Sequence, residues 1–417
     1  MSDSISDAAQ KMQAARCVIA AGVVAALHVG KLPPALPVLE KVLGVSLLQA
    51  GFLLSLVQLA GMTLGLLTGL AVQRIGLRHS MVAGLLLLGG ASALGGLAHG
   101  AAWLLATRAL EGLGFLWVVL PAPGLVRQLV PQERLAGMLG VWGAYMPLGA
   151  SAALLLGPWV MVLGAPEWGW RVWWWLLSAL AGLLAALLLW RVPADRSSRS
   201  SHTGAMASGE NPTPKKLLGL TLRSPAAWLM ALTFAMYSGQ WLAVVGFLPS
   251  IYVQAGVASA ATAWLTALAA GVNILGNLAG GRLLGRGVQP FRLLLAGFLA
   301  MALGATLAFG VQAPPSLQYA GVLLFSVMGG LIPATLFSLA IRLAPSSDTV
   351  STTVGWIQQW SALGQFAGPP LVAWVAVYAG GWQWTAWVTS ACCAIGLLLA
   401  WQIHGLLAVQ AGQRRWR

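Results

Sequence analysis

The sequence predicts an all-α membrane protein with twelve transmembrane helices, arranged as two six-helix pseudo-repeats with both termini in the cytoplasm. Hydrophobic residues make up 59% of the 417 residues and charged residues only 8%, and the mean hydropathy is +0.81. This composition excludes an ordinary soluble enzyme. The apolar residues form runs long enough to cross about 30 Å of hydrocarbon. A multi-pass protein embedded in a lipid bilayer is therefore expected.

The positive charges predict how these runs are threaded. All but four of the 23 Lys and Arg residues lie before the first run, after every second run or at the C-terminal end, and the exceptions are Lys31, Lys41, Arg108 and Arg171. Because short loops rich in Lys and Arg stay cytoplasmic, both termini and the central loop are predicted to be inside. The predicted location is the cell inner membrane.

Twelve runs qualify as spans when they are taken in order. They cover residues 17–39, 46–72, 79–98, 101–127, 135–163, 171–191, 224–251, 260–284, 290–311, 316–342, 350–378 and 383–409. Positive residues precede the first span and follow every second span. They are Lys11 and Arg16 before the first, Arg74 and Arg78 after the second, Arg127 and Arg134 after the fourth, Arg191 to Arg223 after the sixth, Arg282 to Arg292 after the eighth, and Arg342 after the tenth. The first run is too long for a signal-peptide core, so it is predicted to remain as a helix.

The chain is predicted to divide into two halves that repeat one another. Residues 192–223 are rich in Ser, Pro and charge and have no apolar period, which is typical of a linker. An N-terminal half, 1–191, and a C-terminal half, 224–417, flank this predicted cytoplasmic linker. Gly-x-x-x-x-Arg recurs at Gly69 and Gly281, and Leu-Gly at Gly149 and Gly364, with nearly the same offset. Repeats of this kind enclose a substrate site that is exposed to each side of the membrane in turn.

Two signatures resemble those of the major facilitator superfamily. The loop from Gly69 to Arg78, GLAVQRIGLR, is similar to the family's signature between its second and third helices, with Gln73 in place of the usual Asp. Arg108-Ala-Leu-Glu111-Gly-Leu-Gly114 resembles its fourth-helix signature. The stretches 246–256 and 138–142 are similar to the cyanate and nitroimidazole transporter branch (CynX/NimT type). The resemblance implies secondary transport by alternating access.

His28 and Lys31 are candidate substrate-binding residues in the first span. They lie three residues apart and therefore on one helical face, and Pro33 and Pro34 interrupt the helix directly after them. An ionised group deep in the bilayer is costly and usually pairs or lines a cavity. Lys31 is thus predicted to contact an anionic or carboxylate-bearing substrate, with His28 beside it. The alternative is that Lys31 snorkels to the external headgroups and His28 is a helix-contact residue.

Arg108 and Glu111 are candidate coupling or gating residues in the fourth span. They are also three residues apart and can neutralise one another. If the solute displaces Glu111 from Arg108, the carboxylate could take up a proton, which makes the proton a candidate coupling ion. The alternative is a structural ion pair in the inner half of the bundle.

A second set of candidates lies in the repeated cytoplasmic loops. Arginines there can donate to carbonyl groups at helix C-termini, and glycines let helix ends approach closely. The resemblance implies that these residues gate the transport cycle by latching the outward-facing state. The set comprises Gly69, Arg74, Gly76, Arg78 and Arg286.

Neutral polar and aromatic residues inside apolar runs are the remaining candidates for the cavity wall. They are Tyr145, Gln240, Trp241, Asn273 and Gln358. Each could instead hydrogen-bond a neighbouring helix. The tryptophans of 168–175 are predicted to form an interfacial belt.

Several other functions are disfavoured. There is no ATP-binding run, no nucleophile constellation and no metal-ligand spacing among Cys17, Cys392 and Cys393, so no enzyme, cofactor or metal is predicted. The net charge of +14 is spread over loops and does not indicate nucleic-acid binding. The predicted function is secondary active transport of a small organic, anionic or zwitterionic solute. The alternative is an efflux pump that exports a siderophore, metabolite or drug by proton antiport, although the fifth-helix antiporter signature is not kept at its spacing.

Overall fold

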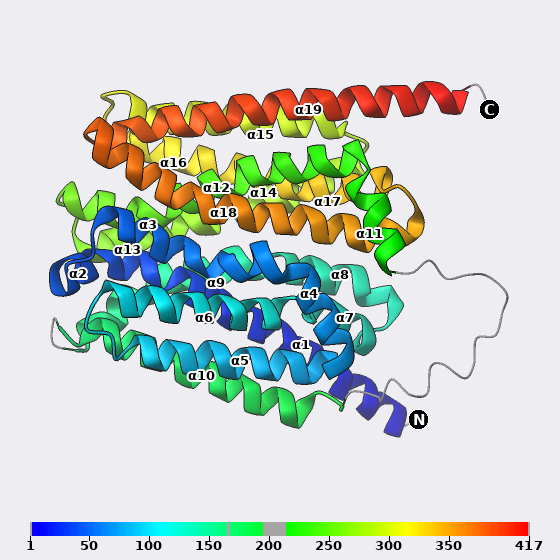
Figure 1. Cartoon of the computed structure of the whole chain (residues 1–417), viewed down its shortest axis with the longest axis horizontal. Helices are drawn as coiled ribbons and strands as arrows, with labels where there is room; N and C mark the ends of the chain where they lie inside the picture. The colour runs from blue at the N-terminus through cyan, green and yellow to red at the C-terminus, as the bar shows by residue number, and fades with distance from the viewer. Residues whose placement is uncertain (1, 165–166, 195–213, 416–417) are drawn as a thin grey trace. The chain divides into compact units, whose positions relative to one another are not determined.

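The computed structural model describes residues 2–164, 167–194 and 214–415, without the side chains of 2–8, 66–71, 73–74, 136, 140, 214–215, 347 and 410–415. Every regular element in these ranges is a helix (Figure 1). Among the described residues, 12 helical segments are long and apolar enough to cross a membrane. The predicted all-α class with twelve spans is therefore confirmed.

The spans agree closely with the sequence-based ranges. Their bounds are Ala9–Leu43, Leu47–Gly65, Leu77–Gly95, Ala101–Leu129, Gln132–Val162, Gly169–Arg191, Pro225–Gln254, Ser259–Gly285, Pro290–Gly310, Pro315–Leu343, Val350–Ala379 and Trp382–Val409. The predicted linker differs, because it contains the helix α11 (Pro214–Leu222). Pro214 at the first helical position favours this start of α11. The hydroxyl groups of Thr221 on α11 and Thr352 share a hydrogen bond of 2.7 Å.

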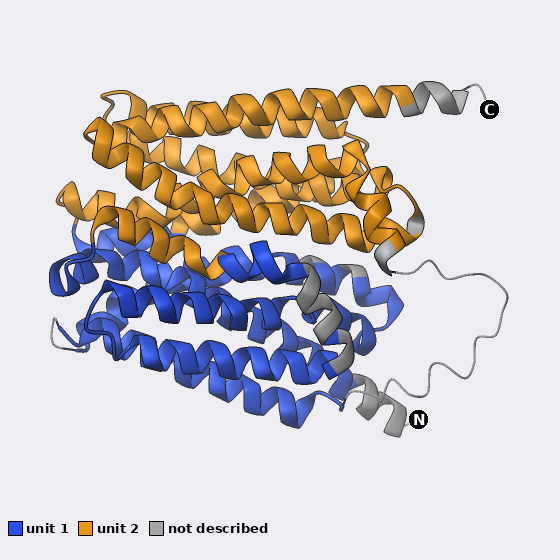
Figure 2. Ribbon diagram, in the orientation of Figure 1, with its two compact units in different colours: residues 1–45, 59–211, 258–267 blue, residues 46–58, 212–257, 268–417 orange. Residues whose placement is uncertain are grey.

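The chain forms two compact units (Figure 2). Unit 1 comprises residues 1–45, 59–211 and 258–267. Its helices are α1 (Ser2–Gly30), α2 (Leu32–Leu43), α4 (Leu59–Ile75), α5 (Leu77–Gly95), α6 (Ala101–Val119), α7 (Ala122–Leu129), α8 (Gln132–Gly143), α9 (Tyr145–Val162), α10 (Gly169–Arg191) and the first part of α13 (Ser259–Gly271). Inside this unit α1 packs against α9 and α10, and α5 packs against α6 and α10.

Unit 2 comprises residues 46–58, 212–257 and 268–417. Its helices are α3 (Leu47–Ser55), η1 (Leu56–Gln58), α11, α12 (Pro225–Gln254), the rest of α13, α14 (Asn273–Gly285), α15 (Pro290–Ala305), η3 (Thr306–Gly310), α16 (Pro315–Gly329), α17 (Leu331–Leu343), η4 (Ser347–Thr349), α18 (Val350–Ala379), η5 (Trp382–Trp384) and α19 (Thr385–Arg415). The compact units thus differ from the predicted halves by the segments 46–58 and 258–267. The division into two six-helix halves stays a prediction.

The first span is interrupted at Lys31, between α1 and α2. Pro33 and Pro34 have no backbone N–H, so the carbonyl groups of Val29 and Gly30 lose the donors that a continuous helix would provide. Both prolines fit the first turn of α2, where backbone N–H groups have no helical acceptor. The interruption follows the sequence prediction, and it leaves carbonyl groups that need partners from other helices.

Small residues provide close helix contacts in each unit. In unit 1, a Cβ atom added to Gly149 on α9 would overlap Ala26 on α1. In unit 2, a Cβ atom added to Gly364 on α18 would overlap Ala235 on α12. Only small residues permit backbones to approach this closely. Gly149 and Gly364 are the two repeated Leu-Gly positions, so both serve the same kind of helix crossing.

Candidate functional site

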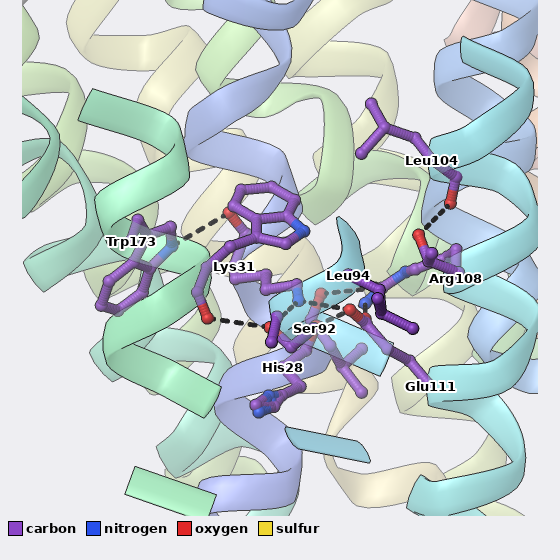
Figure 3. Close-up of polar contacts among 12 residues, drawn as sticks. His28, Lys31, Ser92, Leu94, Leu104, Arg108, Glu111 and Trp173 are labelled. Atoms are coloured by element: carbon purple, nitrogen blue, oxygen red, sulfur yellow. Dashed lines mark hydrogen bonds and ion pairs between the residues drawn. The ribbon is translucent and has the colours of Figure 1, made fainter. Parts of the chain in front are cut away.

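The side chain of Lys31 is completely buried inside unit 1. Its Nζ donates hydrogen bonds to Oε1 of Glu111 at 2.5 Å and to Oγ of Ser92 at 2.8 Å (Figure 3). The same ammonium group lies 4.6 Å from the ring centroid of Trp174. All of these partners belong to the protein interior. The alternative in which Lys31 snorkels to the headgroups is therefore wrong.

Arg108 connects α6 to the interrupted first span. Its Nη1 donates to Oε2 of Glu111 at 2.7 Å and to the carbonyl oxygen of His28 at 2.6 Å, and its Nη2 donates to the carbonyl oxygen of Val29 at 3.1 Å. The carbonyl group of Val29 is the one that loses its helical donor to Pro33. The planar fork of an arginine can reach two carbonyl groups and a carboxylate at once. Arg108 thus supplies the carbonyl group of Val29 with a donor in place of the one lost to Pro33.

Glu111 joins the two predicted residue pairs into one group. Oε1 accepts from Lys31 and Oε2 accepts from Arg108, so a single carboxylate serves two cations. Lys31 and Glu111 are 0% exposed and Arg108 is 2% exposed. We name these three residues the charged cluster. Its formal charge is positive, because two cations face one anion.

Two spans of unit 1 supply the charged cluster. Arg108 and Glu111 lie on α6, in the span Ala101–Leu129, and Lys31 lies between α1 and α2, within the span Ala9–Leu43. The depth of the pair in the membrane stays a prediction.

His28 is buried one turn before Lys31 on α1. Its carbonyl oxygen is held by Arg108, but its imidazole points away from the ammonium group of Lys31 (Figure 3). Neither Nδ1 nor Nε2 has a hydrogen-bond partner among the described residues. The ring is thus a polar group in the interior with unused bonding capacity.

Three residues of this site were not predicted to belong to it. Oγ of Ser92 on α5 accepts from Lys31 and donates to the carbonyl oxygen of Trp174 at 2.9 Å. Nε1 of Trp173 donates to the carbonyl oxygen of Lys31 at 3.3 Å. The predicted interfacial belt is wrong for Trp170, Trp173 and Trp174, which are at most 2% exposed, because their face of α10 packs into unit 1. A lone serine in an apolar run was the one available signal for Ser92.

Tyr145 occupies another part of unit 1. It begins α9, directly after the break that follows α8, and its ring stacks on that of Trp142 with centroids 4.5 Å apart. Trp142 packs against Gly22 on α1. No hydrogen bond, ion pair or ring contact joins Tyr145 to the charged cluster within the described part of unit 1.

The four candidates of unit 2 are uncharged, and two of them share a hydrogen-bonded partner. Nε1 of Trp241 donates to Oγ of Ser326 at 3.2 Å, and Nδ2 of Asn273 donates to the carbonyl oxygen of Ser326 at 2.8 Å and to the hydroxyl of Tyr237 at 3.0 Å. Trp241 and Asn273 are therefore brought together. Gln240 is buried elsewhere, where it donates to its own helix and accepts a hydrogen bond from the thiol of Cys393. Gln358 is exposed and lies apart from both.

The loop candidates are spread over both units. Gly76 separates α4 from α5 with a φ of 96°, a backbone conformation that glycine adopts without strain. Nη2 of Arg78 donates to the carbonyl oxygen of Leu189 in the last turn of α10 at 2.5 Å. Arg286 is exposed at the end of α14. Gly69 lies within α4, and the side chain of Arg74 lies outside the described part of the chain.

Metal ligands are not gathered in the described part of the chain. No group of three His, Cys, Asp or Glu residues there is arranged to hold a metal ion. Cys17, Cys392 and Cys393 are free thiols.

Comparison with known proteins gives a family match and two curated relatives. The model of the Major Facilitator Superfamily matches residues 18–369. Cyanate transport protein CynX of Escherichia coli (strain K12) is 26% identical over 235 residues, which are 56% of this chain and 57% of that protein. A gentisate transporter of Corynebacterium glutamicum is 26% identical over 199 residues, which are 47% of this chain and 44% of that protein. The chain thus matches about half the length of these relatives.

A solved structure shows the same fold over most of the chain. It is a bacterial homolog of the human lysosomal transporter Spinster, in an inward-facing and unoccupied conformation. The TM-score is 0.81 at 14% identity, and the match covers 94% of this chain and 97% of that chain. These findings confirm the resemblance stated from the sequence, including that to the cyanate branch. The chain is therefore a member of the Major Facilitator Superfamily, a family of membrane transporters and not of enzymes.

Proposed function

We propose that the chain is a secondary transporter that moves a small organic anion, or a zwitterion through its anionic group, across the cell inner membrane by alternating access. The observation that carries this proposal is the charged cluster. Two cations and one carboxylate lie inside a unit built of membrane-spanning helices, with 2% exposure at most. The charged cluster needs one more negative charge to be neutral, and a bound anion would supply it.

The argument for an anion is electrostatic. Removing an ion from water costs several kcal/mol even after relaxation, so buried ions are compensated by opposite charge. Glu111 compensates one of the two cations, and its two oxygens are divided between them. A bound carboxylate would compensate the second cation. The names of the two curated relatives support this class, because cyanate and gentisate are both anions at neutral pH.

The arrangement also indicates which contact an anion would replace. Oε2 of Glu111 is held by Arg108, which is anchored in turn to two carbonyl groups of the first span. Oε1 is held by Lys31, whose flexible side chain can turn to a ligand. The sequence suggested that the solute displaces Glu111 from Arg108. We expect instead that the anion displaces Oε1 of Glu111 from Lys31, while Oε2 stays bound to Arg108. The released Oε1 would be the acceptor for a coupling proton.

The proposed orientation places both termini in the cytoplasm. It is supported by the charge pattern and by the described spans. His99 precedes the span Ala101–Leu129, and Arg134 lies beyond the other end of that span, in the first turn of α8. A cysteine in place of His99 is expected to react with a membrane-impermeant maleimide in intact cells, and one in place of Arg134 only after permeabilisation. The reverse labelling pattern would contradict the orientation.

Anion binding tests the proposal directly. Purified protein is mixed with a panel of organic anions, cations and neutral compounds, and thermal unfolding is followed for wild type, Lys31→Met and Lys41→Met. Lys41 is the matched control, because it is an exposed lysine of the same span. Anions are expected to stabilise wild type and Lys41→Met but not Lys31→Met. If cationic or bulky neutral compounds stabilise all three proteins equally, the anion proposal fails and export of such compounds becomes the better account.

A further inference from the structure

We infer that His28 binds a second polar group of the transported anion, so that the substrate is a carboxylate that also carries a hydroxyl or a comparable donor and acceptor. This inference rests on the proposed function, and it deepens it by naming a substrate class. It starts from the unused nitrogens of a completely buried imidazole beside the charged cluster.

A buried polar group without a partner is uncommon, because its desolvation is not repaid. The backbone of His28 is fixed, since Arg108 holds its carbonyl oxygen at 2.6 Å. Val24 and Ala25, one turn earlier on α1, are buried and apolar and offer no side-chain partner. The imidazole also points away from Lys31, so the charged cluster does not satisfy it (Figure 3). A ligand atom is the partner that would use the two nitrogens.

The chemistry of the imidazole sets what that ligand atom must be. A neutral imidazole has one donor and one acceptor nitrogen, and a hydroxyl group is likewise both donor and acceptor. The backbones of His28 and Lys31 are about 4.5 Å apart along the helix axis, and the imidazole then points away from the ammonium group (Figure 3). A molecule that meets both must therefore carry its carboxylate and its second polar group at separate positions. A small linear anion is too short to do so.

The experiment compares carboxylates that differ only in hydroxyl groups. The pairs are benzoate with gentisate, acetate with glycolate, and propionate with lactate. Affinities are measured by thermal shift on the purified full chain for wild type, His28→Leu, His28→Gln and His99→Gln. His99 is the matched control, because it is an exposed histidine of the same unit. Replacing an unsatisfied buried group by an apolar one of similar size is close to neutral for folding, so His28→Leu is expected to fold.

The expected result is a preference of about tenfold for the hydroxylated member of at least one pair, as for one buried hydrogen bond. His28→Leu should abolish that preference, His28→Gln should retain part of it, and His99→Gln should leave it unchanged. If no pair shows a preference, or if His28→Leu keeps it, the imidazole does not contact the transported anion and the inference is overturned. The proposed function then still stands, provided that Lys31→Met loses binding of both members of each pair. If Lys31→Met binds all of them as wild type does, the proposed function fails as well.

Discussion

Replacement of Glu111 by glutamine is expected to destabilise the protein by about 3–5 kcal/mol, the cost typical of removing one partner from a buried ion pair. The variant retains Lys31 and Arg108 inside unit 1 without the carboxylate that both contact. Glutamine preserves the shape of the side chain, so the loss reports on charge. The measurement is the thermal unfolding midpoint in detergent, with and without an organic anion. The added anion is expected to raise the midpoint of Glu111→Gln more than that of wild type, because it replaces the missing charge.

A double variant separates charge from packing. Lys31→Met combined with Glu111→Gln removes one cation together with the carboxylate, so the two substitutions should be strongly non-additive. The double variant is expected to be more stable than Glu111→Gln alone. Additive losses would show that Glu111 contributes through local packing, and the electrostatic account of the charged cluster would have to be abandoned.

Replacement of Arg108 by lysine is expected to cost about 2–4 kcal/mol although the charge is kept. The guanidinium donates to two backbone carbonyl groups and to Glu111, whereas an ammonium group cannot match this fork. Each lost hydrogen bond with a charged donor is worth about 1.5–3 kcal/mol, and lysine can recover part of the total. Chemical denaturation of Arg108→Lys gives the value.

The control for this prediction is Arg127→Lys, because Arg127 is exposed on α7. Exposed substitutions of this kind usually change stability by less than about 0.5 kcal/mol. Equal stability of the two lysine variants would mean that the interrupted first span does not depend on the arginine fork.

Most of the fold could be predicted from the sequence because the bilayer leaves so few solutions. A span needs about twenty apolar residues, and the cationic residues mark alternate gaps between such runs. Helix interruptions were harder to predict. Pro33 and Pro34 predict the interruption between α1 and α2, since proline removes backbone donors. The interruptions at Val272 and Gly330 have no comparable signal in the sequence. Glycine and apolar residues also occur in membrane helices that are not interrupted, so they do not mark an interruption.

The site could be predicted only in parts. The three-residue spacing correctly paired Arg108 with Glu111, because that spacing places residues on one helical face. The same spacing did not pair His28 with Lys31, since the imidazole points away from the ammonium group (Figure 3). No sequence period relates Lys31 to Glu111, so the contact that joins the pairs is a tertiary result. For the buried tryptophans of α10, the sequence-based prediction was wrong. Position near a span end suggested a lipid interface, but packing against α1 and α5 decides their burial.

The most direct test of the proposed transport is counterflow of a labelled organic anion in proteoliposomes. The probe is radiolabelled gentisate or benzoate, and the proteins are wild type, Lys31→Met and Lys41→Met. Wild type and Lys41→Met are expected to accumulate the label against an unlabelled internal pool, and Lys31→Met is expected to lose at least about nine-tenths of this activity, as for a loss of about 1.4 kcal/mol or more. Counterflow by Lys31→Met at the wild-type rate, or movement of cations and neutral solutes with no anion transported, would contradict the account.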